Sequence, residues 1–157
     1  TVTRFAALIG AGPGDPGLIT VRGRVLLAEA DVVVHDHEVD PRVLALASPG
    51  AELIDVGQAG PGALAEEAIS YLIVEKAQEG KRVARLKWGD PFIFDRGGEE
   101  ALFLREQGVD VEIVPGVPIA VAASAFAGIP VTYPGAGDAL TIIRGQDDTG
   151  TSMPDVD

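Results

Sequence analysis

The stretch Gly10-Ala11-Gly12-Pro13-Gly14-Asp15-Pro16-Gly17 decides the fold class through what lies on either side of it. It follows an apolar run, residues 5–9, that is typical of a buried strand. It precedes Thr20, which can cap a helix over residues 21–28. A strand, a glycine-rich turn and a helix place backbone N–H groups close to a ligand. The sequence therefore predicts a βα unit, whose turn either borders a ligand or is simply tight.

The glycine spacing in this turn also matches a nucleotide-binding pattern. Positions 12, 14 and 17 satisfy G-x-G-x-x-G, and Asp36 follows about twenty residues later. Pro13 and Pro16 interrupt the pattern, and each removes a backbone N–H donor that a phosphate would need. The turn therefore favours a rigid wall beside a ligand over a pyrophosphate nest. A nicotinamide-dependent oxidoreductase remains an alternative that rests on the glycine spacing alone.

Apolar runs alternate with helix-forming runs along most of the 157 residues. This alternation predicts an α/β fold with a five-stranded, mainly parallel sheet and helices on both faces. The expected strands are residues 4–9, 31–34, 52–56, 82–86 and 110–114, and the expected helices are residues 21–28, 41–47, 65–78, 99–107 and 119–127. A further strand, detached or swapped, is expected at residues 139–144, and a mobile tail from residue 146.

Composition narrows the classes of partner. Lys and Arg number 12 and Asp and Glu 24, so the formal net charge of −12 disfavours nucleic acid and anionic membranes. No apolar run reaches the roughly 18 residues that a membrane span requires, and we expect no secretory signal. The absence of cysteine excludes disulfides and a cysteine nucleophile. It fits a cytoplasmic protein.

Unusual residues follow the expected strands, at the edge where parallel sheets of this kind bind ligands. After the fourth strand comes Lys87-Trp88-Gly89-Asp90-Pro91-Phe92-Ile93-Phe94. Gly89 allows close backbone approach, and Asp90 can bind a ligand amine or hydroxyl or form an Asx turn. Glu99 and Glu100, further on, are interpreted as helix first-turn charges, with the preceding arginine solvated or paired to one of them.

Asp36, at the end of the second strand, faces the same edge and is the candidate for chemistry. His35 and His37 flank it and can share one side of an extended segment. They lack a third ligand at a recognisable spacing, so we predict a structural role for them and no metal site.

Several motifs then occur in an order that resembles the tetrapyrrole methylase family, over the chain to about Thr132. They are Gly10-Ala11-Gly12-Pro13-Gly14-Asp15-Pro16-Gly17-Leu18-Ile19-Thr20, Val33-Val34-His35-Asp36, Arg85-Leu86-Lys87-Trp88-Gly89-Asp90-Pro91-Phe92-Ile93-Phe94, Arg96-Gly97-Gly98-Glu99-Glu100, Val114-Pro115-Gly116 and Ala127-Gly128-Ile129-Pro130-Val131-Thr132.

This resemblance implies a C-methyltransferase that uses S-adenosylmethionine and acts on a tetrapyrrole, either uroporphyrinogen III or a precorrin. It implies two α/β domains with the cofactor between them, a homodimer, and a reaction without metal. Asp36 would be the proton acceptor. Cofactor contacts would fall on Pro13, Trp88, Gly89, Asp90, Ile93, Pro118 and Ile119.

The sequence departs from the family pattern at several of these positions. Trp88 and Asp95 stand where the family usually has glycine, and Gln58 stands where it has a proton-donating lysine. Pro118-Ile119 replaces a Thr-Ser or Thr-Ala pair. We expect residues 1–131 to form the amino-terminal domain and residues 132–157 to begin a truncated second domain, so that this chain alone is inactive. The alternative is a divergent, non-catalytic binding module of the same fold.

Overall fold

The computed structural model of the chain describes residues 4–57, 64–137 and 139–145. The chain divides into two compact units, Thr1–Ile119 and Ala120–Asp157, and each is described by itself. The expected domain boundary between residues 131 and 132 stays a prediction.

A parallel sheet of five strands forms the centre of the first unit, in the order β3-β2-β4-β1-β5. Its strands are β1 (Phe5–Gly10), β2 (Val32–His35), β3 (Glu52–Asp55), β4 (Arg82–Lys87) and β5 (Asp110–Val114). Every pairing between neighbouring strands is parallel. The predicted α/β fold with its five-stranded parallel sheet is therefore confirmed.

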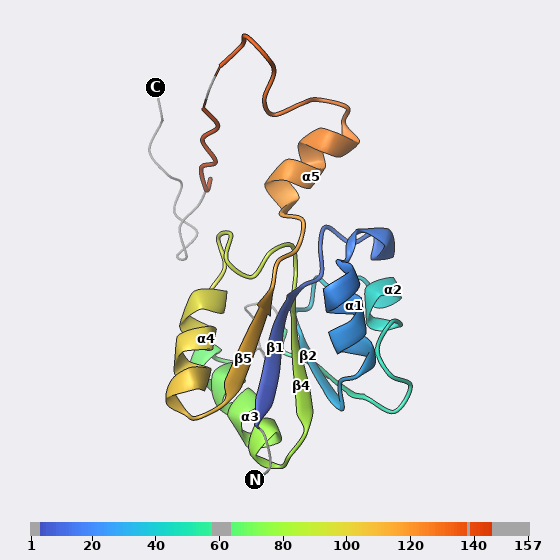
Figure 1. Cartoon of the computed structure of the whole chain (residues 1–157), viewed down its shortest axis with the longest axis vertical. Helices are drawn as coiled ribbons and strands as arrows, with labels where there is room; N and C mark the ends of the chain where they lie inside the picture. Colours follow the sequence, from blue (N-terminus) through green and yellow to red (C-terminus); the bar gives the residue numbers. More distant parts are fainter. Residues whose placement is uncertain (1–3, 58–63, 138, 146–157) are drawn as a thin grey trace. The chain divides into compact units, whose positions relative to one another are not determined.

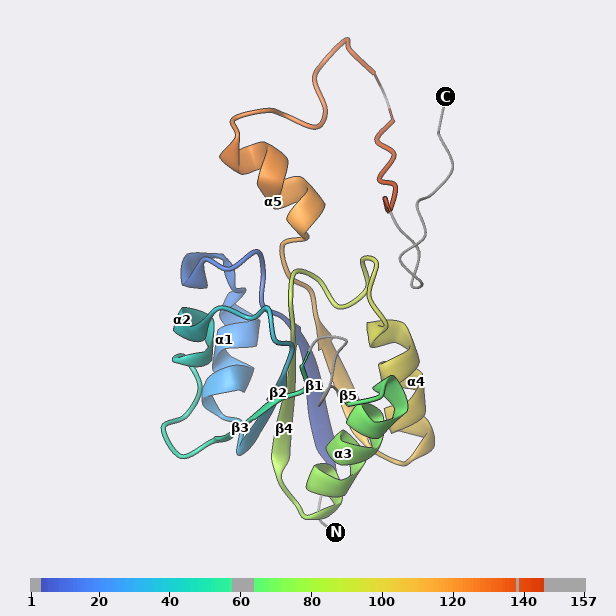
Figure 2. The ribbon, with the colours of Figure 1, turned by 180° about the vertical axis from the view of Figure 1, so that it is seen from behind.

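Helices cover both faces of this sheet. They are α1 (Val21–Ala28), α2 (Pro41–Leu44), α3 (Glu66–Gln78) and α4 (Gly97–Glu106). Figures 1 and 2 show α1 and α2 on one face and α3 and α4 on the other. Alternate residues of the central strand β1 supply the two cores: Ala6 and Leu8 pack on the α3 and α4 side, and Ala7 and Ile9 on the α1 and α2 side.

Local sequence signals decide where the helices begin. Thr20 Oγ1 accepts a hydrogen bond from Gly23 N at 3.0 Å, which confirms the predicted cap of α1. Asp40 caps α2 by accepting from Arg42 N at 2.8 Å, with Pro41 at the first helical position as predicted. Both caps therefore satisfy backbone N–H groups in the first turn of the helix.

The second unit contains most of α5 (Ile119–Phe126). Gly128, at φ 71°, ends the helix: its N–H donates to Ala125 O, and Ile129 N donates to Ser124 O. The strand expected at residues 139–144 is wrong, because residues 139–145 form no strand in the part of the chain that the structure describes. An apolar run becomes a strand only where a neighbour accepts its backbone hydrogen bonds, and no such pairing forms there.

Candidate functional site

The loops that follow β1 and β4 meet at the carboxyl end of the sheet. Gly12 N donates to Gly89 O at 3.1 Å, and Gly89 N donates to Gly12 O at 3.0 Å. Nearer the strands, Ala11 N donates to Lys87 O at 2.7 Å. β1 and β4 are neighbours, yet their loops lead to α1 on one face and to α4 on the other. Ligands bind at such diverging loops in open parallel sheets.

Asp90 ties the loop after β4 to the loop after β5. Its Oδ1 accepts a hydrogen bond from Phe92 N at 2.8 Å, which confirms the Asx turn, and its Oδ2 accepts from Gly116 N at 3.0 Å. Gly116 packs backbone to backbone with Gly10 and Gly89, since a Cβ on Gly116 would overlap Gly89 O. Three loops are therefore held together at this edge, and Asp90 meets a ligand only with the lone pairs that these bonds leave.

The glycine-rich loop itself keeps few backbone donors for a ligand. As described above, Ala11 N donates to Lys87 of β4 and Gly12 N donates to Gly89 of the loop that follows it. Gly17 N donates to Asp15 Oδ1 at 2.8 Å, and Pro13 and Pro16 have no N–H. This hydrogen-bonding pattern agrees with a rigid wall beside a ligand and disfavours a pyrophosphate nest.

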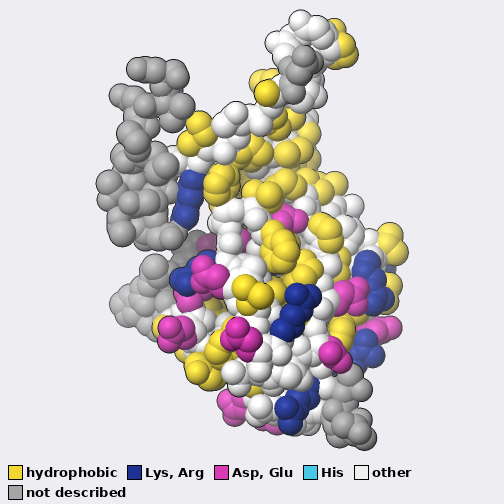
Figure 3. Space-filling view, turned by 60° about the vertical axis from the view of Figure 1, so that its left-hand side comes forward, with side chains coloured by type: hydrophobic (Ala, Val, Ile, Leu, Met, Phe, Trp, Pro, Cys, Tyr) yellow, Lys and Arg dark blue, Asp and Glu magenta, His cyan; other side chains and the backbone are white. Residues whose placement is uncertain are grey.

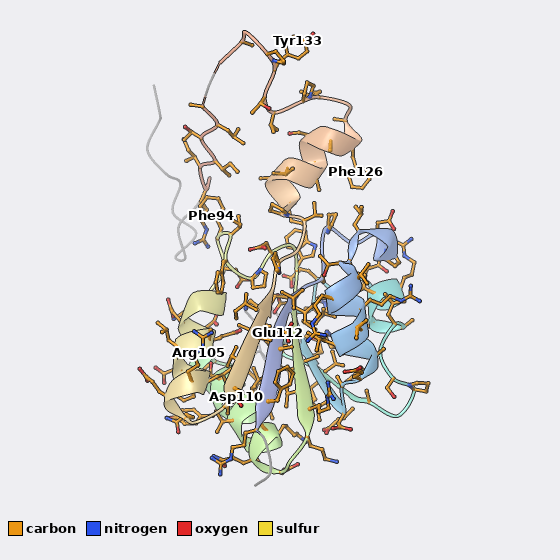
Figure 4. All side chains as sticks on the ribbon, viewed as in Figure 1. Phe94, Arg105, Asp110, Glu112, Phe126 and Tyr133 are labelled. Carbon is orange, nitrogen blue, oxygen red and sulfur yellow. The ribbon has the colours of Figure 1, made fainter. Side chains whose placement is uncertain are left out.

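The structure brings together only some of the predicted cofactor-binding residues. Ile119 lies beside Gly89, so that a Cβ there would be 3.4 Å from Ile119 Cγ1. Pro13 and Pro118 are half-buried, whereas Trp88 and Ile93 expose 41% and 45% of their surface. The exposed apolar groups line the loop after β4, and Figure 4 shows Phe94 there, at the opposite end of the first unit from Asp110.

A cluster of buried charges lies beneath that loop, on the α3 and α4 side of the sheet. We call it the β4 charge cluster: Arg85 and Lys87 of β4 with Glu100 of α4. Glu100 Oε1 accepts from Lys87 Nζ at 3.1 Å and from Arg85 Nε at 3.3 Å. All three side chains are almost fully buried. Glu99 and Glu100 lie in the first turn of α4, as predicted. The sequence did not predict that α4 packs Glu100 against the sheet, where it is buried.

Asp36 joins the cluster to the loop crossing. Its Oδ1 forms an ion pair with Arg85 Nη2 at 2.6 Å, and its Oδ2 accepts from Trp88 N at 2.9 Å. Burial opposes the charged form of Arg85, but Glu100 and Asp36 outweigh it and raise the pKa of the guanidinium. The candidate catalytic residue is thus fixed at both oxygens, and it orients the backbone at the start of the loop after β4.

A cavity of about 290 Å³ opens beside Asp36. Arg85, Lys87 and Asp95 line it with Asp36, and Val56, Leu64 and Ile69 supply apolar walls. Its volume is at the lower end for small-molecule sites, so it can admit part of a large substrate. The cavity combines an anchored carboxylate, two buried cations and apolar walls.

The two histidines have separate structural partners. His35 is buried and its Nδ1 lies 2.9 Å from Asp36 O, so this nitrogen donates to the carbonyl. His37 Nδ1 lies 2.9 Å from Asp55 Oδ2, and this contact raises the pKa of His37. Among residues 4–57, 64–137 and 139–145, the structure shows no group of three His, Asp or Glu side chains arranged for a metal ion.

Sequence reasoning missed the β4 charge cluster. The alternation of side chains along a strand carried a signal for it. Positions 83, 85 and 87 share one face, so an apolar Val83 predicts that Arg85 and Lys87 are buried as well. The prediction ended the strand at residue 86 and placed Lys87 in the loop. Gln58, the other acid–base position considered, lies outside the described residues.

Known proteins resemble the chain in sequence and in structure. Residues 7–155 match the tetrapyrrole (corrin/porphyrin) methylases. Siroheme synthase 2 of Yersinia pestis is 49% identical, over 96% of this chain and 31% of its own length. Uroporphyrinogen-III C-methyltransferase of Methanocaldococcus jannaschii is 46% identical, over 93% of this chain and 61% of its own length.

A solved structure agrees with these matches. Uroporphyrin-III C-methyltransferase of Thermus thermophilus, complexed with S-adenosylhomocysteine, superposes with a TM-score of 0.81 at 43% identity. The alignment covers 96% of this chain and 63% of that one. The chain thus spans from about a third to about three fifths of the relatives it matches. Within the described residues, no helix is long and apolar enough to cross a membrane.

Proposed function

The chain belongs to the tetrapyrrole methylase family, and on that premise we propose that it contributes the cofactor site of an S-adenosylmethionine-dependent C-methyltransferase. The proposed substrate is uroporphyrinogen III, with a precorrin as the alternative tetrapyrrole. The observation that supports this most is the backbone crossing of Gly12 and Gly89 at the point where neighbouring loops diverge. The relative of similar fold that is complexed with S-adenosylhomocysteine supports the same cofactor.

The residues around the crossing suit this cofactor. The exposed apolar surface of Ile93 fits an adenine ring, and Asp90 offers a carboxylate to an amine or hydroxyl. Trp88 borders the same site, where its indole occupies space that a glycine would leave open. We propose that these contacts extend to Gly89, to Pro13 of the facing loop, and to Pro118 and Ile119 after β5. A nicotinamide dinucleotide fits less well, because the glycine-rich loop uses its early N–H groups internally.

S-adenosylmethionine supplies a sulfonium methyl group, which a nucleophilic pyrrole carbon takes in line. The chain supplies proximity and orientation: the crossing holds the loops rigid, and the cavity beside Asp36 receives the reacting edge of the substrate. The methylated ring then loses a proton, and we propose Asp36 as its acceptor. Arg85 and the Trp88 amide hold that carboxylate in one orientation.

The charges of the chain set a condition on the substrate, because uroporphyrinogen carries many carboxylates. Arg22, Arg42 and Arg96 lie on the surface, and each pairs with a carboxylate of this chain. Figure 3 shows acidic and basic side chains interspersed on the face that it displays. We therefore expect association with the chain to be slow at low salt and faster as salt rises.

Calorimetry tests the cofactor, and an isotope assay tests the reaction. We expect S-adenosylhomocysteine to bind the chain, and NAD and NADP not to bind. Binding should be weak and should tighten in Trp88→Gly, since indole replaces the usual glycine.

We expect methyl transfer to uroporphyrinogen III from the gene product that carries the chain, and none from the 157 residues alone. Turnover by the 157 residues would contradict the second expectation, and preferential binding of NAD would overturn the proposal.

The proposal extends to assembly and location. We propose a homodimer in the cytoplasm, with no nucleic acid or membrane as partner, as the family resemblance and the net charge of −12 suggest. Light scattering on the purified gene product measures the mass of the particle, and a monomer at micromolar concentration would contradict the dimer.

A further inference from the structure

Asp95 lines the same cavity as Asp36 but differs from it in how its oxygens are engaged. Asp95 Oδ1 accepts from Arg96 N at 2.6 Å and lies 3.0 Å from Lys87 Nζ. Among the described residues, no hydrogen bond to Asp95 Oδ2 is found. The side chain is 23% exposed, so this free oxygen belongs to a carboxylate that water can reach.

Asp36 has no comparable freedom. Arg85 holds one of its oxygens and the amide of Trp88 holds the other. A proton on either oxygen of Asp36 would therefore displace one of these two contacts. A nearby group that takes the proton from Asp36 would restore both contacts.

We propose that Asp95 is a second acid–base residue of this cavity, which takes the proton from Asp36 and passes it to bulk water. The inference rests on the proposed methyl transfer. The methylated pyrrole carbon of a uroporphyrinogen carries a side chain and no hydrogen, so the proton leaves a methylene bridge beside that ring. The C–H electron pair of the bridge returns to the conjugated system, and the proton binds Asp36. It then moves through cavity water to the free oxygen of Asp95 and leaves to solvent, so that both carboxylates end the cycle unprotonated. The step needs no co-reactant.

The charges that face Asp95 fit this role. Burial raises the pKa of Asp95 above its usual range, and the negative charge of Asp36 adds to this, against the opposite effects of Lys87 and the Arg96 amide. Such a carboxyl group takes up a proton more readily than an ordinary aspartate. The other charged groups that contact these residues or line the cavity are Arg85 of β4, Glu100 of α4 and Glu66 at the start of α3.

The first test measures proton uptake on the chain without any turnover. A carbon-13 NMR titration follows the aspartate carboxyl signals in the natural chain, in Asp36→Asn and in Asp110→Asn, a change at an exposed site in β5. We expect Asp95 to titrate above the ordinary value of about 3.9. Its midpoint should fall in Asp36→Asn and stay in place in Asp110→Asn. A midpoint at or below the ordinary value, or one insensitive to Asp36, overturns the proposal.

The second test measures methyl transfer against pH in the gene product that carries the chain. Asp95→Asn should lower kcat by about 10² to 10⁴ and move the fall in rate to more acid pH, because a relay carboxylate works only when unprotonated and the one with the raised pKa is then absent. Asp95→Glu should restore part of the rate, and Asp110→Asn should have no effect. S-adenosylhomocysteine affinity should be the same in all four proteins.

The outcomes separate this inference from the proposed function. If the natural protein is active and Asp95→Asn keeps both its rate and its acid limb, Asp95 is no relay and Asp36 stands alone. If a loss of rate comes with a loss of S-adenosylhomocysteine affinity, Asp95 holds the site together and the relay is overturned. If the natural protein binds no S-adenosylhomocysteine and transfers no methyl group, the proposed function fails, and the titration alone decides whether Asp95 exchanges protons with Asp36.

Discussion

Ion pairs occur in two regions of this molecule, with similar side chains and different surroundings. Around the rim of the sheet lie exposed pairs, such as Arg22 with Glu112 and Arg82 with Glu29. Beneath the loop after β4 lies the β4 charge cluster, in which Arg85, Lys87 and Glu100 are each 2% or 3% exposed. Exposed pairs contribute little to stability, whereas buried charges carry a large desolvation cost.

The difference in burial between the exposed ion pairs and the β4 charge cluster indicates where charged side chains are kept for a reason other than stability. The opposite face of β4 carries Ala84 and Leu86, so this strand supports an ordinary apolar interior on that side. Glu100 Oε2 has no hydrogen-bond partner among the described residues although it is buried, which adds to the cost. The cluster thus places unfavourable buried charge directly behind Asp36, where the proposed chemistry takes place.

The strongest way to break this comparison uses two adjacent glutamates of α4. Glu100→Ala leaves two cations buried without their shared carboxylate, so we expect unfolding free energy to fall by about 3–5 kcal/mol. Glu99→Ala removes an exposed partner of Arg96 and should stay within about 0.5 kcal/mol. Urea titration measures both. Equal losses in the two variants would show that burial of the cluster makes no difference.

A second change tests the link between the cluster and the loop crossing. Asp36→Asn weakens the contact with Arg85 and the bond from the Trp88 amide, and hydrogen bonds to charged groups contribute about 1.5–3 kcal/mol. We expect the free energy of unfolding, measured by urea titration, to fall by an amount in that range. Hydrogen exchange of the Trp88 amide should become faster before that of other amides. Asp110→Asn is the control. A loss confined to global stability, with the protection of Trp88 unchanged, would contradict an anchoring role.

A smaller effect is expected at the rim. Glu112→Gln breaks the ion pair with Arg22, whose contact lowers the pKa of Glu112. Because both partners are in contact with water, we expect the substitution to lower the melting temperature only slightly at low salt. The difference should vanish at about 1 M salt, where the screening length is about 3 Å. A large fall in melting temperature that persists at high salt would show that the Arg22–Glu112 pair behaves like the buried β4 charge cluster.

The smallest effect concerns pH at the cap of α2. Hydrogen bonding to Arg42 lowers the pKa of Asp40 to about 2. A lowered carboxyl pKa stabilises the folded state above the unfolded value of about 3.9, and this contribution disappears as pH falls toward 2. The free energies of unfolding of the natural chain and of Asp40→Asn should therefore differ by a constant amount near neutral pH and become equal in acid. Urea titrations at several pH values measure this difference. A difference in unfolding free energy that grows in acid would contradict the expected direction of the pH dependence.

The fold could be predicted because its signals are local and repeated. Thr20 and Asp40 cap helices in the predicted way, and the period of the strands assigns residues to the two faces. The strand expected at residues 139–144 failed for the opposite reason. A strand depends on a neighbour elsewhere in the chain, and no local signal supplies that neighbour.

The site could be predicted only in outline. The carboxyl edge of the sheet and the loops that form it follow from chain order and parallel pairing. The bonds from Asp90 to Gly116 and from Asp36 to the Trp88 amide join segments distant in the sequence, so no spacing reveals them. Lys87 and Glu100 look like surface charges until the packing of α4 against β4 places them in the interior.

One measurement tests the central proposal, a cofactor site at the loop crossing, most directly. Amide NMR signals of the labelled chain are followed as S-adenosylhomocysteine is added, which detects even weak binding. We predict shifts concentrated at Gly12, Gly89 and Asp90, with no change at Gly108 at the other end of the sheet. Saturating addition without shifts at Gly12 and Gly89, or shifts centred on Gly108, would contradict the proposed site.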